Sequence, residues 1–168
     1  MTSPLPVAPP TPAPLPYGDV AAPAPYAPWI SRVGSRLLDI LLYLPLAIIA
    51  EVVAATMSEP GATTGTAVLT PAGALVIVVL ILLDLALWVW NIGLLGGRTG
   101  STLGKRALGT RLVLTSTGQP VGVGMALLRD LLHVLDNFLF LGYLWPLWDA
   151  RRQTFADKIV SSVVVTNG

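Results

Sequence analysis

Two long apolar runs, separated by a short loop, constrain the fold of this chain more than any other feature. The first run extends from about Leu37 to Met57 and the second from Ala72 to Leu95. A helix of either length spans roughly 30 Å, the thickness of the hydrocarbon core of a bilayer. With 54% hydrophobic and 11% charged residues in 168, the chain also has more apolar surface than a soluble core of that size buries. The sequence therefore predicts an integral membrane protein.

The basic residues are distributed unevenly around these runs. The loop 96–111 holds four of the ten Lys and Arg residues, namely Arg98, Lys105, Arg106 and Arg111. Arg32 and Arg36 precede the first run, whereas the loop 58–71 between the runs contains no Lys or Arg. By the positive-inside rule, we expect a multi-pass protein of the cell membrane with a cytoplasmic N-terminus and a cytoplasmic loop 96–111.

This loop contains Gly104 and Lys105, a pair that also occurs in phosphate-binding P-loops. The remainder of that motif is missing, because Thr99 and Arg106 occupy the positions where glycine and Ser or Thr are needed. We expect Lys105, Arg106 and Arg111 to contact anionic lipid headgroups instead, which is a purely electrostatic role.

Each apolar run contains a carboxylate. Asp39 follows Arg36 by three residues and Arg32 by seven, so a helix places them on nearby faces and an Arg–Asp ion pair is expected. Such a pair either fixes the depth of the helix or belongs to a permeation path. Asp84 lies mid-way along the second run, where an unpaired carboxylate costs roughly 2.5 to 3.5 kcal/mol. It should be protonated, paired or directed at a polar interior, and Asp84 and Asp39 are candidate proton- or ion-binding residues, with an interhelical hydrogen bond as the alternative for Asp84.

The chain after the basic loop mixes apolar helix with charge. Residues 110–115 are typical of a short strand, and 159–166 form a second β-rich run that can pair with it. The apolar segment 124–148 carries four polar residues at helical spacing, for which we favour a paired, solvated helix face over a polar groove: Arg129, Asp130, His133 and Asp136.

Three further basic residues follow that segment: Arg151, Arg152 and Lys158. Because a single crossing would place them outside, we expect a helical hairpin or re-entrant pair, with a single third span as the alternative. The expected fold is an all-α membrane protein with two transmembrane helices, a third apolar hairpin or span, and a small cytoplasmic β element.

Residues 1–28 differ in composition from the rest of the chain. They contain ten prolines and one charged residue, Asp19, without hydrophobic periodicity. We expect a disordered tail that leans toward polyproline II and acts as a solvated spacer in preference to an SH3-type ligand. It lacks the basic start and continuous apolar run of a cleaved export signal. Residues 29–166 then form one transmembrane domain.

Four short motifs occur along the chain in a characteristic order. Trp29-x-x-Arg32 is followed by Asp39, TLGKRALGTR (102–111) follows the second run, LLR (127–129) opens the third apolar segment, and RQTFADK (152–158) precedes a valine run. This order resembles the RDD family of small bacterial membrane proteins, over residues 29–166. The resemblance implies that Arg32, Asp39 and Asp157 are the residues for which the family is named.

The resemblance also implies a membrane domain for which transport of ions or small solutes is the usual suggestion. Two positions depart from the family pattern. Ala156 stands where many members carry histidine, which weakens the case for a His–Asp proton relay at Asp157, and Asp84 lies outside the pattern. Among basic neighbours, Asp157 is expected to dock or cap a helix in preference to catalysing a reaction.

Catalytic and metal chemistry find little support in the composition. The chain has no cysteine and one histidine, His133, so disulfides, thiolate sites and histidine-rich metal sites are excluded. No Ser-His-Asp order or paired-carboxylate pattern is visible, and we expect no enzyme activity, no cofactor and no nucleic-acid partner. The favoured function is transport of ions or small solutes by a homo-oligomer in the bilayer, using intramembrane carboxylates. The alternative is a non-catalytic scaffold or adaptor that binds a partner through the proline-rich tail and the basic cytoplasmic loop.

Overall fold

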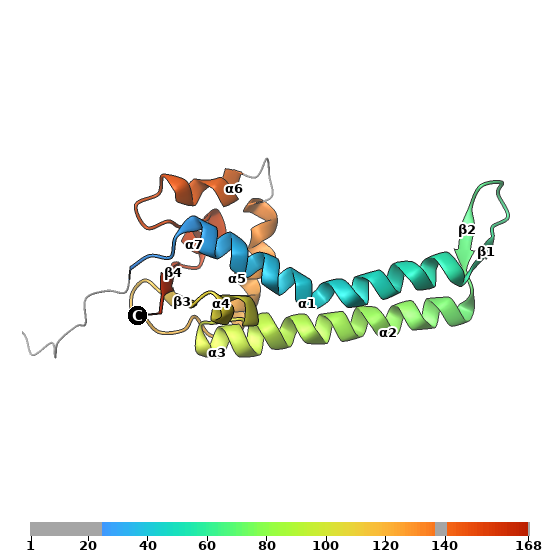
Figure 1. The fold of residues 1–168 in the computed structure, drawn as a ribbon, viewed down its shortest axis with the longest axis horizontal. Coiled ribbons are helices and arrows are strands. Elements are labelled where there is room, and N and C mark those ends of the chain that lie inside the picture. Colours follow the sequence, from blue (N-terminus) through green and yellow to red (C-terminus); the bar gives the residue numbers. More distant parts are fainter. Residues whose placement is uncertain (1–24, 137–140, 168) are drawn as a thin grey trace, which may run out of the picture.

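The computed structural model describes residues 25–136 and 141–167. Two long helices dominate it (Figure 1). Helix α1 is Trp29–Thr56, and α2, Pro71–Trp88, continues without a break through a π-helical segment, η1 (Val89–Gly96), into α3 (Gly97–Thr99). Helix α1 therefore begins before the predicted run 37–57, and the continuous α2–α3 helix ends after the predicted run 72–95. Both extensions lie at the end of the helix where the basic residues are found. Thr70 caps α2 by accepting a hydrogen bond from the amide of Gly73 at 3.1 Å, and Pro71 fills the first helical position.

These two helices, taken as Trp29–Thr56 and Pro71–Thr99, are the spans among the described residues that are long and apolar enough to cross a membrane. In their most apolar windows only 6% and 11% of the residues are buried inside the protein. A core helix of a soluble protein buries its apolar side chains against its neighbours, whereas these point outward. The outward-facing apolar surface is that of helices surrounded by lipid.

A β-hairpin joins the two long helices. Strands β1 (Ser58–Pro60) and β2 (Ala67–Leu69) pair antiparallel, with Glu59 opposite Val68. The sequence predicted only a loop here. Figure 1 places this hairpin at one end of the helix pair and the remaining elements at the other.

The elements at the opposite end form a compact unit with the first turns of α1, and we call it the head. Besides α3 it contains α4 (Leu103–Ala107), β3 (Thr110–Leu114), α5 (Val123–Asp136), α6 (Leu141–Leu144), the 3₁₀ turn η3 (Trp145–Leu147), α7 (Phe155–Ile159) and β4 (Ser162–Thr166). Strands β3 and β4 pair antiparallel, with Leu112 opposite Val164. The predicted pairing of these two runs is confirmed.

A small apolar core lies beneath this strand pair, built from Leu112, Val121, Ala126 and Val164 together with Ala27. The amide of Ala27 donates to the carbonyl of Val164 at 2.9 Å, so the chain before α1 extends the strand pair. Residues 25–28, which the sequence assigned to the tail, thus belong to the head. The predicted disorder of residues 1–24 lies outside the described residues.

The third apolar segment forms short helices in the head. Helix α5 has 14 residues and α6 has four, and residues 137–140 between them lie outside the described residues. Neither helix reaches the roughly 20 residues that a crossing requires. The described parts of the segment lie at the head end of the long helices (Figure 1).

Helix α5 has an unusual orientation. Its polar side chains Arg129, His133 and Asp136 are buried in the head, whereas Leu131 and Val134 are 62% and 67% exposed. The prediction of a solvated polar face is therefore wrong, and the alternative of an inward polar groove is correct. An outward apolar face is favourable where the helix borders lipid instead of water.

Candidate functional site

The head is organised around buried carboxylates, and the first of them is Asp157. Arg32 at the start of α1 forms an ion pair with Asp157 of α7. The Nε of Arg129 on α5 donates to the other oxygen at 2.7 Å, and the Asp157 side chain is fully buried. Asp157 also accepts from the amide of Thr154 in a capping box at the start of α7. One carboxylate therefore joins α1, α5 and α7.

The electrostatics of Asp157 follow from these contacts. Burial alone raises the pKa of its carboxyl group, because a charge is costly away from water. The guanidinium groups of Arg129 and Arg32, together with the hydrogen bonds, outweigh burial and hold the pKa well below its ordinary value. The Asp157 carboxylate therefore stays charged near neutral pH, where it joins Arg32 and Arg129. It is poorly suited to release and recapture a proton there.

Asp39 is the second buried carboxylate, and its contacts correct the predicted ion pair with Arg32 or Arg36. It accepts hydrogen bonds from Asn91 Nδ2 at 2.9 Å, Thr102 Oγ1 at 2.6 Å and the amide of Gly104 at 2.9 Å. No arginine pairs with it within the described residues, because Arg32 reaches Asp157 and Arg36 reaches Asp130. Asp39 docks the TLGKR segment against α1 through neutral donors.

This docking leaves no room for a side chain at Gly104. A Cβ atom there would lie 2.0 Å from the carbonyl oxygen of Ser35 and 2.9 Å from Asp39 Cγ. Asn91 completes the contact, since its Oδ1 accepts from the amide of Leu103 at 3.0 Å. Sequence reasoning missed Asn91, although an amide in an otherwise apolar run is a signal for a buried hydrogen bond. It lies in the π-helical segment, a feature often found at functional positions.

The polar face of α5 carries two more carboxylates. Asp130 accepts from Arg36 at 2.7 Å and from the indole of Trp88 at 2.8 Å. Asp136 contacts the Nδ1 of His133 and accepts from the amide of Phe155 at 3.0 Å. Burial and the charge of Arg129 lower the pKa of His133, even though Asp136 opposes this shift.

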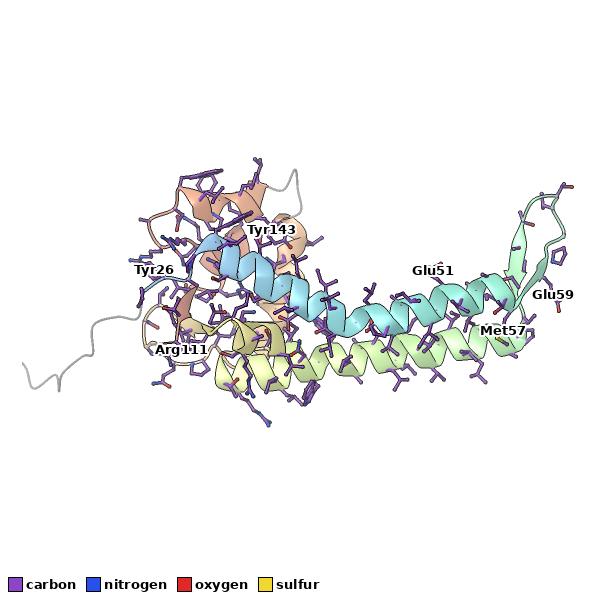
Figure 2. The ribbon with its side chains drawn as sticks, viewed as in Figure 1. Tyr26, Glu51, Met57, Glu59, Arg111 and Tyr143 are labelled. Carbon is purple, nitrogen blue, oxygen red and sulfur yellow. The ribbon has the colours of Figure 1, made fainter. Side chains whose placement is uncertain are left out.

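Between α1, α5 and α6 the head contains an open cavity of about 540 Å³. Its walls include four cationic side chains, one carboxylate and several aromatic and aliphatic groups. The principal lining residues are Trp29, Arg32, Arg36, Lys105, Arg129, Asp130, His133, Tyr143 and Leu144. Tyr143 lies in the head in Figure 2, and its ring stacks on His133 with centroids 5.5 Å apart.

The predicted lipid-contacting residues have different environments. Arg106 and Arg111 are exposed, and Figure 2 shows Arg111 on the head, whereas Lys105 is half-buried and lines the cavity. Burial, followed by the charge of Arg129, lowers the pKa of Lys105 to about 8. The headgroup role of the three residues stays a prediction.

Asp84 lies on α2, about one turn before Trp88, and no hydrogen bond joins it to these clusters within the described residues. Its Oδ1 atom is buried, and no hydrogen-bond donor reaches it within the described residues. Glu51 on α1 is exposed by contrast, away from the head in Figure 2. Among the same residues no group of three His, Asp or Glu side chains has an arrangement that could hold a metal ion.

Arg32, Asp39 and Asp157 lie within the part of the chain that matches a known family. The model of the RDD family matches residues 26–161, which is most of the chain. The chain belongs to the RDD family. No solved structure matches it.

Curated relatives of this RDD protein carry the name proline-rich antigen. "Proline-rich antigen homolog" of Mycobacterium tuberculosis, in strains CDC 1551 / Oshkosh and H37Rv, is 39% identical over 151 residues, 83% of this chain and 63% of the relative. "Proline-rich antigen" of Mycobacterium leprae (strain TN) is 45% identical over 83 residues, 49% of this chain and 33% of that protein. The chain thus spans less than two thirds of the length of these relatives.

Proposed function

We propose that this RDD protein is a multi-pass protein of the cell membrane, in which α1 and α2 cross the bilayer and the head is cytoplasmic. All ten Lys and Arg residues belong to the head or to the first turns of α1, and none lies between Leu37 and Gly97. The β1–β2 hairpin at the other end carries Glu59 and no basic residue (Figure 2). This charge asymmetry supports the orientation through the positive-inside rule.

Within this topology the proposed function is transport of a proton or another small ion, with Asp84 as the intramembrane binding group. The supporting observation is the buried Oδ1 of Asp84, which has no donor among the described residues. A carboxylate inside a span is expensive and is found where it has a functional or pairing role. Asp39, the other candidate, is already occupied by three donors that dock α4.

A single copy offers little enclosure for such a path. Two helices packed side by side surround no channel, so the path requires helices from further copies. We therefore propose a homo-oligomer in which the α2 faces that carry Asp84 line the path. A second copy would also supply a polar partner for this carboxylate, as interhelical hydrogen bonds do in membranes.

The test is a flux assay in proteoliposomes for protons and monovalent cations. Wild-type protein, Asp84→Asn and the control Glu51→Gln are compared at equal insertion, since Glu51 is an exposed carboxylate on α1. Transport through Asp84 predicts loss of flux in Asp84→Asn and wild-type flux in Glu51→Gln. Equal flux in all three proteins would contradict the role of Asp84.

The adaptor alternative makes the opposite prediction. In that case no cation moves in any variant, and deletion of residues 1–24 abolishes binding of a protein partner while the protein still inserts. The two functions are therefore separated by combining the flux assay with this deletion.

A further inference from the structure

The cavity in the head has a chemical character that the proposed transport does not use. Four cationic groups from three elements line it: Arg32 and Arg36 of α1, Lys105 of α4 and Arg129 of α5. Asp130 is the carboxylate among the described lining residues. Three more carboxylates lie behind the wall and are almost fully buried, namely Asp39, Asp136 and Asp157. They offset the positive charge, but their oxygens already accept hydrogen bonds.

The cationic groups retain unused donors. Arg129 is 7% exposed and gives its Nε–H to Asp157, but its terminal N–H groups bond to no described residue. The ammonium of Lys105 likewise makes no hydrogen bond or ion pair within the described part of the chain. A guanidinium has five N–H donors and an ammonium has three, and neither can accept. The wall therefore suits a ligand that offers several acceptors and a negative charge, as a phosphate does.

The same cavity has an apolar side. Trp29, Leu37 and Leu144 line it together with the cationic groups. Leu37 is 56% exposed and lies where the outward apolar surface of α1 starts. Leu131 and Val134 of α5 also point outward (Overall fold), so the cavity lies where the head meets the lipid-facing surface. A free phosphate would leave this apolar side unfilled, whereas a lipid places acyl chains there.

We propose that the cavity binds the phosphate of an anionic membrane lipid, with the unused N–H groups of Arg129 and Lys105 as donors and the acyl chains leaving along Leu37. This site differs from the exposed basic surface formed by Arg106 and Arg111, which attracts anionic lipids without enclosing them. It is also independent of Asp84 and of transport.

The experiment measures binding by isothermal titration at pH 7 with the full chain in a neutral detergent. The probes are dihexanoyl phosphatidylglycerol, zwitterionic dihexanoyl phosphatidylcholine and inorganic phosphate. Lys105→Met removes the ammonium group and keeps a long, unbranched side chain. Arg106→Met is its matched control, because it removes an adjacent exposed charge that does not line the cavity.

The proposal predicts saturable binding of phosphatidylglycerol at one site per chain. Loss of a charge-assisted hydrogen bond should weaken it about tenfold in Lys105→Met and less than about twofold in Arg106→Met. Lys105→Arg, which keeps the donor charge, should restore binding and shows that a loss in Lys105→Met is not misfolding. Asp84→Asn should bind as the wild type does, so failure of the transport proposal leaves this test intact.

Three results would overturn the lipid site. Equal weakening by Lys105→Met and Arg106→Met would assign binding to general surface charge. Binding of inorganic phosphate as tight as that of phosphatidylglycerol would assign the cavity to a soluble ligand. Absence of saturable phosphatidylglycerol binding would remove the site altogether.

Discussion

Arg32 and Asp157 form an ion pair although 125 residues separate them in the sequence. The pair fixes α7 against the first turns of α1, and Arg129 adds α5 to the same carboxylate. Since most of α1 and all of α2 lie between these two residues in the sequence, the pair connects elements from opposite ends of the matched region.

Asp157→Asn should destabilise the head by about 3 to 5 kcal/mol, because it leaves two buried guanidinium groups without their carboxylate. Thermal unfolding in detergent, followed by tryptophan fluorescence, measures the loss. Lys158→Met is the control, as Lys158 is 43% exposed and its ion pair with Asp149 should be worth less than about 1 kcal/mol. Similar losses in the two variants would show that the buried pair is not specially stabilising.

The depressed pKa of Asp157 also predicts a pH dependence of head stability. The folded-state pKa lies below the unfolded value near 4, so the stabilisation is complete above about pH 4 and is lost as the pH falls toward the folded value. The unfolding temperature of the wild type should therefore drop progressively as the pH falls below about 4. Asp157→Asn should show a smaller drop over this range, and an equal drop would assign the acid sensitivity to other groups.

Gly104→Ala should separate α4 from α1, because the new Cβ would overlap the carbonyl oxygen of Ser35. The expected cost is about 1 to 3 kcal/mol in the same unfolding assay. Gly124→Ala is a control that should raise the stability of the protein. No atom lies within 4 Å of its Cβ position, and alanine favours the helix by up to about 1 kcal/mol. A neutral Gly104→Ala would mean that α4 shifts without loss of its docking contacts.

Lys105 should make phosphatidylglycerol binding depend on pH. With a pKa of about 8, the ammonium is mostly charged at pH 7 and mostly neutral at pH 9, while the lipid phosphodiester keeps its charge. Affinity should thus fall between pH 7 and 9, by up to about tenfold. Lys105→Arg should bind equally at both values, because a guanidinium stays protonated. A fall of the same size in Lys105→Arg would place the titrating group elsewhere.

The orientation of the helices can be read by labelling, because the chain has no native cysteine. Thr64→Cys lies in the β1–β2 hairpin and Ser116→Cys in the exposed turn after β3. A membrane-impermeant maleimide should label Thr64→Cys on intact cells and Ser116→Cys only after permeabilisation. The reverse pattern would place the head outside.

The elements with strong local patterns were predictable from the sequence. The two long helices follow from apolar runs and the β3–β4 pair from two β-rich runs, since hydropathy and β-branching act over a few residues. The hairpin between the helices was missed because Ser58-Glu59-Pro60 has none of the features of a strand.

The connections within the head were not predictable from spacing alone. Arg32, Arg36 and Asp39 share a helix, so local geometry favoured a pair among them, yet each binds a residue distant in sequence. The polar face of α5 was also assigned to solvent, because amphipathic patterns show two faces without showing which one is buried. Only the folded arrangement, with lipid-facing surface on one side, decides that question.

The backbone bond between Ala27 and Val164 has a consequence for the order of assembly. The segment before α1 leaves the ribosome before β4 does, so the extended strand pair cannot close until β4 has been made. Helices α1 and α2 can enter the bilayer earlier, on their apolar surface alone. Insertion would thus precede closure of the head, and a chain halted before α7 would be membrane-bound with Arg32 and Arg129 still lacking the carboxylate of Asp157.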